Sequence, residues 1–354
     1  MLVALTRPHR FEHSTPYYRM RVLSGVQPSG LLHLGNYYGA LQQYIELQHE
    51  EEALYFIADL HALTTVRDAA ALREATFEAA LAFLSLGLDP SKAILFRQSD
   101  IPEITELQWI LGCLVPLSHL ERAHGYKDKT ARGIAPNFGL IAYPVLMAAD
   151  ILAFGADVVP VGKDQMQHLE FARDWATRFN LAFVEGYDPQ DPEACRQGNA
   201  RGILKLPRTR LQETAALVPG TDGQKMSKSS GNTIDLFADD DTVRKQIMGI
   251  KTDSTSIELP KPDNALYRLL GLVAPPAGFA QIDASWRSGG KGYAEYKKAL
   301  LEYFHAAFDA PRRRRAELIQ DRGEIERILA DGARRARGIA APIIEQVRRA
   351  VGIR

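Results

Sequence analysis

Up to about residue 235, short apolar runs alternate with longer stretches whose apolar positions repeat at helical spacing. The runs at residues 22–26, 53–57, 93–96 and 157–161 are short enough for buried strands. Strands separated by helices predict a Rossmann-like α/β fold, a doubly wound parallel sheet with helices on both faces. Ligands of such sheets bind beyond the carboxyl ends of the strands, where Gln27, Asp59, Gln98 and Gly162 would lie.

After about residue 235 the pattern becomes helical, with no convincing buried strand. Near the end, Ile325, Leu329 and Ala336 recur at helical spacing, whereas Gly332 interrupts the apolar face and argues against one unbroken helix. We therefore expect an N-terminal extension at 1–19, an α/β domain at 20–234 and an α-helical domain at 235–354.

Composition narrows the class of protein. Of the 354 residues, 46% are hydrophobic and 24% charged, which is typical of a globular protein and argues against disorder and fibres. No apolar run approaches the roughly 20 residues of a membrane-spanning helix. The two cysteines, Cys113 and Cys195, exclude a disulfide framework or a cysteine-based metal cage and suit a reducing compartment.

The 43 basic and 43 acidic residues cancel, but they are unevenly placed. Residues 1–240 hold 22 basic and 29 acidic side chains, and residues 241–354 hold 21 and 14. The C-terminal third is therefore the basic part of the molecule, which is compatible with a polyanionic partner or with an ordinary solvated helical surface.

A polar turn follows the first expected strand. The chain contains no G-x-x-x-x-G-K-[ST] loop and no G-x-G-x-x-G fingerprint. Instead, His33 and Asn36 would share the first turn of a helix, placing two donors at the positive end of its dipole. Gly35 would let a flat ring approach the backbone. The turn is either an anion site or a simple helix cap.

A second polar segment, residues 223–232, is bounded by glycines and contains Lys225, Lys228 and three serines. Such a loop could close over a polyphosphate, following charge as it moves during a reaction. Lysine and serine are equally common in solvated surface loops. Alone, the composition does not separate the two interpretations.

Taken in this order, the two segments resemble the HIGH and KMSKS signatures of class I aminoacyl-tRNA synthetases. The resemblance runs from about Arg21 to the C-terminus and is closest to the bacterial tryptophanyl-tRNA synthetases. It is carried by residues 33–36 (His-Leu-Gly-Asn), 225–229 (Lys-Met-Ser-Lys-Ser), 24–30, 120–122, 127–129, 143–152 and 159–165. Residues 206–223 depart from the common bacterial sequence and are longer.

The resemblance implies an ATP-dependent ligase that converts L-tryptophan to tryptophanyl-adenylate and transfers it to the 3′ end of tRNA(Trp). Mg²⁺ would accompany ATP, and no metal would be held by protein ligands. The implied catalytic residues are His33, Asn36, Lys129, Lys225 and Lys228. The implied ATP-binding residues are Gln27, Ser29, Gly35, Asn36, Gly162, Asp164, Lys225, Met226, Ser227, Lys228 and Ser229.

The amino-acid pocket can also be argued from one residue. Asp150 lies in the apolar stretch 145–152, where a carboxylate is costly unless paired. An indole N–H is a donor-only group that would pair with it, although an aspartate in such a helix can also be purely structural. The resemblance implies a tryptophan site made by Leu23, Gly25, His61, Tyr143, Met147, Asp150, Val161 and Gln165. We expect His168 and Glu170 to face solvent or a partner.

The resemblance also assigns roles to the domains. Residues 20–234 would be catalytic, with a dimer-forming insertion at about 100–150 that includes Trp109, Cys113 and Leu117. Residues 235–354 would bind the tRNA anticodon region, with Arg312–Arg315 and the arginines of the last helix facing phosphates. The implied protein is a cytoplasmic homodimer with neither DNA nor a membrane as partner.

Three alternatives stay open. A tyrosyl-tRNA synthetase shares the fold and both signatures. A small-molecule nucleotidyltransferase would need neither this form of the second loop nor a basic helical domain. A non-catalytic RNA-binding paralogue predicts loss of His33, Asn36, Lys225 or Lys228, all of which are present.

Overall fold

The computed structural model describes residues 19–28, 30, 32–123, 137–162, 165–211 and 218–353. Expectations for the extension 1–18 therefore lie outside the described residues. The elements are β1 (Arg21–Val26), α1 (Leu34–Asn36), η1 (Tyr37–Leu41), α2 (Gln42–Leu47), β2 (Glu52–Ile57), α3 (Asp59–Ala62), α4 (Ala69–Ser85), β3 (Ile94–Arg97), η2 (Gln98–Asp100), α5 (Pro102–Gly112), α6 (Leu117–Glu121), α8 (Phe138–Leu152), β4 (Val158–Val161), α9 (Met166–Phe183), β5 (Arg208–Leu211), η4 (Lys228–Ser230), α10 (Asp240–Met248), α11 (Ala265–Val273), α12 (Pro276–Ser288), α13 (Tyr293–Leu318) and α14 (Arg322–Ala350).

The sheet is parallel and has the order β3-β2-β1-β4-β5. It confirms the predicted Rossmann-like α/β class and all four predicted strands, with their ends within one or two residues. The fifth strand, β5, was not predicted. It pairs with β4 at the sheet edge, and its sequence Arg-Thr-Arg-Leu contains no apolar run because an edge strand needs no cover on both faces.

Alternating side chains of β2 build a separate core on each face of the sheet. Tyr55 packs with the helices α2 and α4 on one face. Leu54 and Phe56 pack with α5, α8 and α9 on the other face. The strand is buried on both sides, which is why its sequence is continuously apolar.

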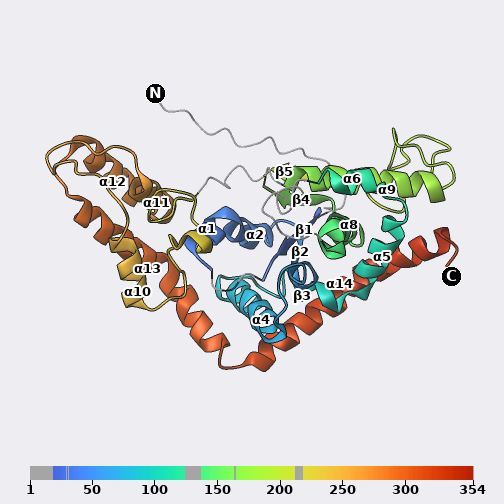
Figure 1. Ribbon diagram of the computed structural model, residues 1–354, viewed down its shortest axis with the longest axis horizontal. Coiled ribbons are helices and arrows are strands. Elements are labelled where there is room, and N and C mark those ends of the chain that lie inside the picture. Colours follow the sequence, from blue (N-terminus) through green and yellow to red (C-terminus); the bar gives the residue numbers. More distant parts are fainter. Residues whose placement is uncertain are drawn as a thin grey trace.

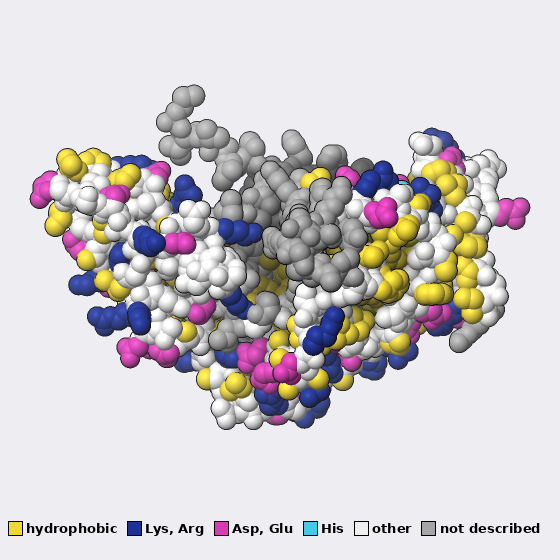
Figure 2. Space-filling model, viewed as in Figure 1, with side chains coloured by type: hydrophobic (Ala, Val, Ile, Leu, Met, Phe, Trp, Pro, Cys, Tyr) yellow, Lys and Arg dark blue, Asp and Glu magenta, His cyan; other side chains and the backbone are white. Residues whose placement is uncertain are grey.

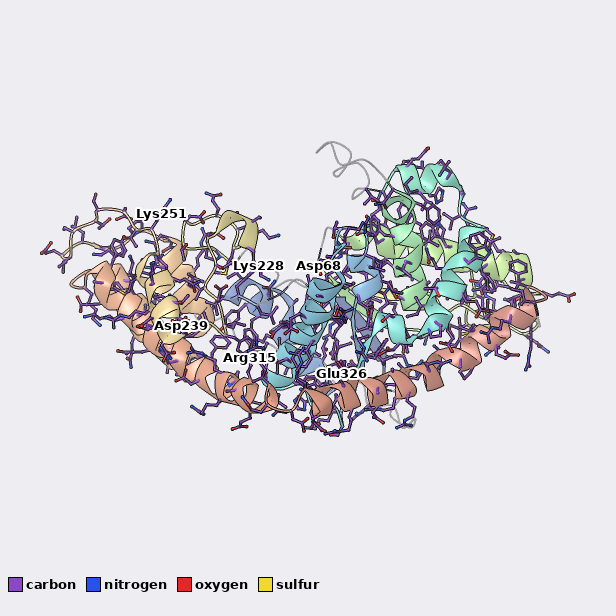
Figure 3. All side chains as sticks on the ribbon, turned by 60° about the horizontal axis from the view of Figure 1, so that its bottom comes forward. Asp68, Lys228, Asp239, Lys251, Arg315 and Glu326 are labelled. Carbon is purple, nitrogen blue, oxygen red and sulfur yellow. The ribbon has the colours of Figure 1, made fainter. Side chains whose placement is uncertain are left out.

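The long helices α13 and α14 meet at an angle and run along one side of the molecule, as Figures 1 and 3 show. Helices α10 to α12 gather at the far end of α13, away from the sheet. Helix α14 instead returns beneath β3 and α5, and its apolar side joins the core around Phe96 and Leu107. The division of the chain at residue 235 stays a prediction, since the last helix shares a core with the sheet.

Gly332 argued against one unbroken final helix, and that expectation is wrong. Helix α14 is unbroken through Gly332 and through Pro342. A Cβ atom at Gly332 would lie 1.8 Å from the carbonyl oxygen of Leu95 in β3. The glycine is therefore a close-approach position where the helix backbone lies against the strand backbone, and it does not end the helix.

Candidate active site

The first motif caps a short helix at the end of β1. His33 precedes α1, and its backbone N–H donates to Asn36 Oδ1 at 3.1 Å. The Asn36 amide nitrogen makes no hydrogen bond within the described part of the chain, which leaves a donor for a ligand. Burial and the nearby Lys228 ammonium lower the pKa of His33, so its imidazole is neutral near pH 7.

The second motif packs directly on the first, although about 190 residues separate them. The Gly35 N–H points at Met226 Sδ over 3.3 Å, and a Cβ atom at Gly35 would lie 3.2 Å from the Met226 Cβ atom. The side chain of Met226 is buried in this contact. A side chain at Gly35 would therefore press on Met226, so a glycine favours this contact between the motifs, and Met226 fills part of the space beside it.

A buried asparagine shapes the second motif. Asn232 Oδ1 accepts from the Ser227 N–H at 2.8 Å, and its Nδ2 donates to Asp222 Oδ1 and to the Lys225 carbonyl at 2.7 and 3.1 Å. These bonds turn the chain so that both lysines of the motif reach the same cavity. Partial burial lowers the pKa of Lys228, and the carboxylate of Asp235 opposes that effect.

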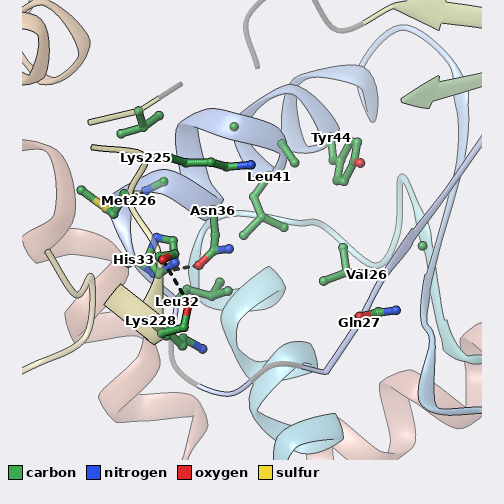
Figure 4. Close-up of a pocket in the computed structure, with 17 residues that line it drawn as sticks. Val26, Gln27, Leu32, His33, Asn36, Leu41, Tyr44, Lys225, Met226 and Lys228 are labelled. Atoms are coloured by element: carbon green, nitrogen blue, oxygen red, sulfur yellow. Dashed lines mark hydrogen bonds between the residues drawn. The ribbon is translucent and has the colours of Figure 1, made fainter. Parts of the chain in front are cut away.

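The two motifs line a cavity of about 680 Å³ beside the carboxyl end of β1, shown in Figure 4. Its lining combines the neutral imidazole with two lysine ammonium groups and the start of a helix. Such a set suits a polyphosphate. The predicted ATP-site or catalytic residues that line it are Gln27, His33, Gly35, Asn36, Lys225, Met226, Ser227, Lys228 and Ser229.

A second cavity of about 650 Å³ adjoins the first, and Gly25, Gln27 and Tyr44 line both. All eight residues predicted for the tryptophan site line this second cavity: Leu23, Gly25, His61, Tyr143, Met147, Asp150, Val161 and Gln165. Gly162, predicted for ATP, also lies here. The adjoining cavities could hold two reactants in contact.

Asp150 of α8 is the buried carboxylate of the second cavity, with 1% of the residue exposed. Burial raises its pKa, while two donors work in the opposite direction. His61 Nε2 lies 3.0 Å from Asp150 Oδ2, and Gln98 Nε2 donates to Oδ1 and Oδ2 at 2.7 and 2.9 Å. The carboxylate is therefore paired, as its position in an apolar helix required.

Two residues near this site were missed or misplaced by the sequence interpretation. Gln98 was not among the predicted site residues, although its position directly after β3 indicated the ligand edge of the sheet. The expectation that His168 faces solvent is wrong. His168 is buried in the first turn of α9, lines the second cavity, and places Nε2 3.2 Å from the hydroxyl of Tyr143. His168 is buried because a helix that starts just after β4 has its first turn over the ligand-binding edge of the sheet. Glu170 is exposed, as expected.

The predicted residues Ser29, Lys129 and Asp164 lie outside the described residues. Among the residues that are described, no three His, Cys, Asp or Glu side chains gather as a metal site would require. In the same ranges, no helix combines the length and the apolar character needed to cross a membrane.

Comparison with known proteins agrees with this geometry. The family model described as tRNA synthetases class I (W and Y) matches residues 16–307. A tryptophan–tRNA ligase of Rhodopirellula baltica is 50% identical over 337 residues, which cover 95% of this chain and 100% of that protein. A ligase of the same name from Fusobacterium nucleatum is 44% identical over 335 residues, covering 94% of this chain and 98% of the relative.

Solved structures give the same result. The crystal structure of tryptophanyl-tRNA synthetase from Campylobacter jejuni complexed with ADP and tryptophan is 43% identical, with a TM-score of 0.84 over 94% of this chain and 100% of that one. A tyrosyl-tRNA synthetase from Archaeoglobus fulgidus, 23% identical with a TM-score of 0.59, is similar in fold alone; it covers 84% of this chain and 90% of that one. The chain belongs to the class I tRNA synthetase family of the tryptophan and tyrosine enzymes and, within it, to the tryptophan–tRNA ligases.

Proposed function

We propose that the two adjoining cavities activate L-tryptophan with ATP and that the activated amino acid passes to the 3′ end of tRNA(Trp). The observation that carries this proposal is the shared boundary of the cavities. One is lined by phosphate-binding groups and the other by a buried carboxylate that can accept from an indole N–H. ATP and tryptophan are the two reactants that this pair of linings fits.

The tryptophan carboxylate oxygen attacks the α-phosphorus of ATP, and the bond from that phosphorus to the β-bridging oxygen breaks. Pyrophosphate leaves with the electron pair, and tryptophanyl-adenylate stays bound. Charge grows on the leaving group, and Lys225, Lys228 and the Asn36 amide stabilise it. Mg²⁺ would accompany ATP and supply further positive charge near the phosphates. Transfer then forms an ester with the terminal ribose of the tRNA and releases AMP.

The second cavity selects the amino acid. Asp150 accepts from the indole N–H, and Met147, one turn earlier in α8, packs beside the ring. Tyr143 and Gln165 line the same cavity and would hold the α-amino group, as the family resemblance implies. A site that bonds a specific N–H rejects competitors that lack it far better than shape alone does.

The experiment that tests the proposal is ATP–pyrophosphate exchange by the purified protein with each of the twenty amino acids. We expect exchange with tryptophan, in the presence of Mg²⁺. Exchange with tyrosine in its place would make the chain a tyrosyl-tRNA synthetase. Absence of exchange with every amino acid at saturating ATP would refute the proposal.

We propose that the tRNA meets the helical region 235–354, where it binds near the anticodon. The structure divides the arginines of this region into two groups. Arg315 pairs with Glu78 and Arg337 with Glu103, each at 2.7 Å, so these cations are neutralised within the chain. Arg313 and Arg314 are exposed on α13 and form no ion pair with the residues that the structure describes, which supports them as phosphate contacts.

We propose that the protein is a homodimer formed through the segment of about 100–150. Trp109 on α5, Leu117 on α6 and Phe138 on α8 are 73%, 62% and 76% exposed. Figure 2 shows hydrophobic side chains gathered over the part of the surface where these helices lie. An exposed apolar area of this kind marks an interaction surface.

The dimer is tested by replacing Trp109 with Glu and measuring molecular mass by sedimentation. We expect monomers, because a charge at a buried contact is not compensated. The control is Ile257→Glu, an equally drastic change at another exposed apolar residue in the helical region. An unchanged mass for the Trp109 variant would contradict the proposed interface.

A further inference from the structure

Within the proposed tryptophan site, on which this inference rests, we propose that Gln98 is a positioning residue that determines specificity. Its amide fixes the Asp150 carboxylate as a hydrogen-bond acceptor aimed at the indole N–H. Gln98 has no exposed surface, follows β3 directly and is not one of the residues that line the cavity. It therefore acts on the ligand through the residues it bonds, chiefly Asp150.

The orientation of the Gln98 amide is set from both ends. Its Oε1 atom accepts from the backbone N–H of His61 at 3.3 Å, a group that can only donate. Its Nε2 atom must then face Asp150, where it donates to both carboxylate oxygens. The same glutamine thus joins the start of α3, which carries His61, to α8, which carries Asp150.

The backbone that carries Gln98 is also held from both sides. The neighbouring Arg97 donates to Asp100 Oδ2 at 2.9 Å and to Glu326 Oε2 of α14 at 2.8 Å. Ser99 on the other side donates its N–H to Asp59 Oδ1 at 3.0 Å. The backbone position from which the Gln98 side chain reaches Asp150 is therefore fixed by hydrogen bonds to two other parts of the chain.

An uncharged donor beside Asp150 suits the role of this carboxylate as an acceptor for the indole N–H. Asp150 accepts an indole N–H most strongly in its ionised form, because a charged acceptor strengthens the bond and protonation turns one of the two oxygens into a donor. Burial alone favours protonation. Gln98 and His61 supply donors without adding a negative charge, and together they leave lone pairs of the carboxylate for the ligand.

The test compares L-tryptophan with β-(3-benzothienyl)-L-alanine, in which sulfur replaces the indole N–H. Gln98→Met keeps the length and the volume of the side chain and removes the amide. We expect this variant to bind tryptophan about tenfold to a hundredfold more weakly, the usual effect of one hydrogen bond to a charged group. Its affinity for the sulfur analogue, measured by calorimetry without ATP, should stay close to that of the unmodified chain.

A merely structural glutamine gives a different result, since both ligands would then lose affinity equally. That outcome overturns the proposal, as does unchanged tryptophan affinity. These outcomes are distinct from failure of the proposed function, in which the unmodified chain itself shows no tryptophan-dependent exchange.

A second variant keeps the test decisive if the methionine variant does not fold. In Gln98→Glu, two buried carboxyls share one proton, and the protonated Glu replaces the amide donor. Tryptophan affinity should then fall as pH rises and that proton is lost, while the unmodified chain shows no such fall. Affinity of the Glu variant that does not change with pH would contradict the proposal.

Discussion

At the scale of single residues, Lys228 carries a charge into a partly buried position between the two motifs. A Cβ atom at Gly30, in the turn after β1, would lie 3.6 Å from its Nζ atom. Burial lowers the pKa of this ammonium, and the carboxylate of Asp235 opposes that effect. A phosphate group in the cavity would bring negative charge to this ammonium, so the lysine suits a site in which charge grows on a leaving pyrophosphate.

We therefore expect Lys228→Ala to reduce the rate of adenylation by roughly 10²-fold or more, as removal of one oxyanion donor does in other enzymes. The affinity for tryptophan without ATP should be almost unchanged, because the amino acid binds in the other cavity. Single-turnover adenylate formation and calorimetry measure the two quantities. Lys245→Ala, on the exposed side of α10, is the matched control and should leave both unchanged. Equal losses of rate and of tryptophan affinity would refute a role in the transition state.

Asp150 gives a prediction for pH. Its pKa is raised by burial, so the carboxyl takes up a proton at a higher pH than an exposed aspartate, whose pKa is near 3.9. Below the raised pKa the carboxyl of Asp150 is neutral, so its hydrogen bond from the indole N–H loses the contribution of the negative charge. Tryptophan affinity should therefore weaken as pH falls through that range.

The pH prediction is checked by measuring the dissociation constant of tryptophan across the acid range. Asp150→Asn stays neutral at every pH, so its affinity should be lower than that of the unmodified chain near pH 7 and should lose this acid dependence. An Asn variant with the same pH profile would show that another group controls binding.

At the scale of elements, strands that are buried in the core can be predicted from the sequence. Features that depend on contacts between distant segments cannot. The strands β1 to β4 are buried on both faces, so their apolar runs were sufficient to find them. Strand β5 lies at the edge and has no such signal. The eight residues predicted for the amino-acid pocket were found through family motifs, and they line one cavity. Gln98 carries no such motif, and it contacts Asp150 only because folding brings the two together across 52 positions.

Helix α14 also depends on a contact with a distant segment that the sequence did not reveal, and this contact gives a stability prediction. Gly332→Ala would force a methyl group against the Leu95 carbonyl, so we expect α14 to shift from β3 at a cost of about 1–3 kcal/mol or more. Gly338→Ala, two turns on and with open space around it, should instead stabilise the protein by up to about 1 kcal/mol through helix propensity. Urea unfolding of both variants measures the difference, and destabilisation of equal size would contradict the close approach at Gly332.

At the scale of the whole molecule, the even charge balance conceals two different uses of arginine. Several arginines of the C-terminal third hold α14 and α13 to the acidic α/β part. Arg348 pairs with Glu106 of α5, for example, and Arg337 pairs with Glu103 of the same helix, a residue that is itself buried. The excess of positive charge in residues 241–354 therefore overstates the charge that is available to tRNA.

The arginines to test for tRNA binding are therefore the exposed ones that form no ion pair with the residues that the structure describes. Replacing Arg313 and Arg314 together with Ala should weaken tRNA binding and reduce the slope of log affinity against log salt by about 1 for each phosphate that an arginine no longer neutralises. Tryptophan-dependent exchange should not change, because it uses no tRNA. Arg327 and Arg334 form the control pair, since they are as exposed but are already paired with Glu324 and Asp331. If replacing the control pair changes the salt dependence as much as replacing the α13 pair does, then ion pairing within the chain does not keep arginines from tRNA, and the distinction between the two groups is wrong.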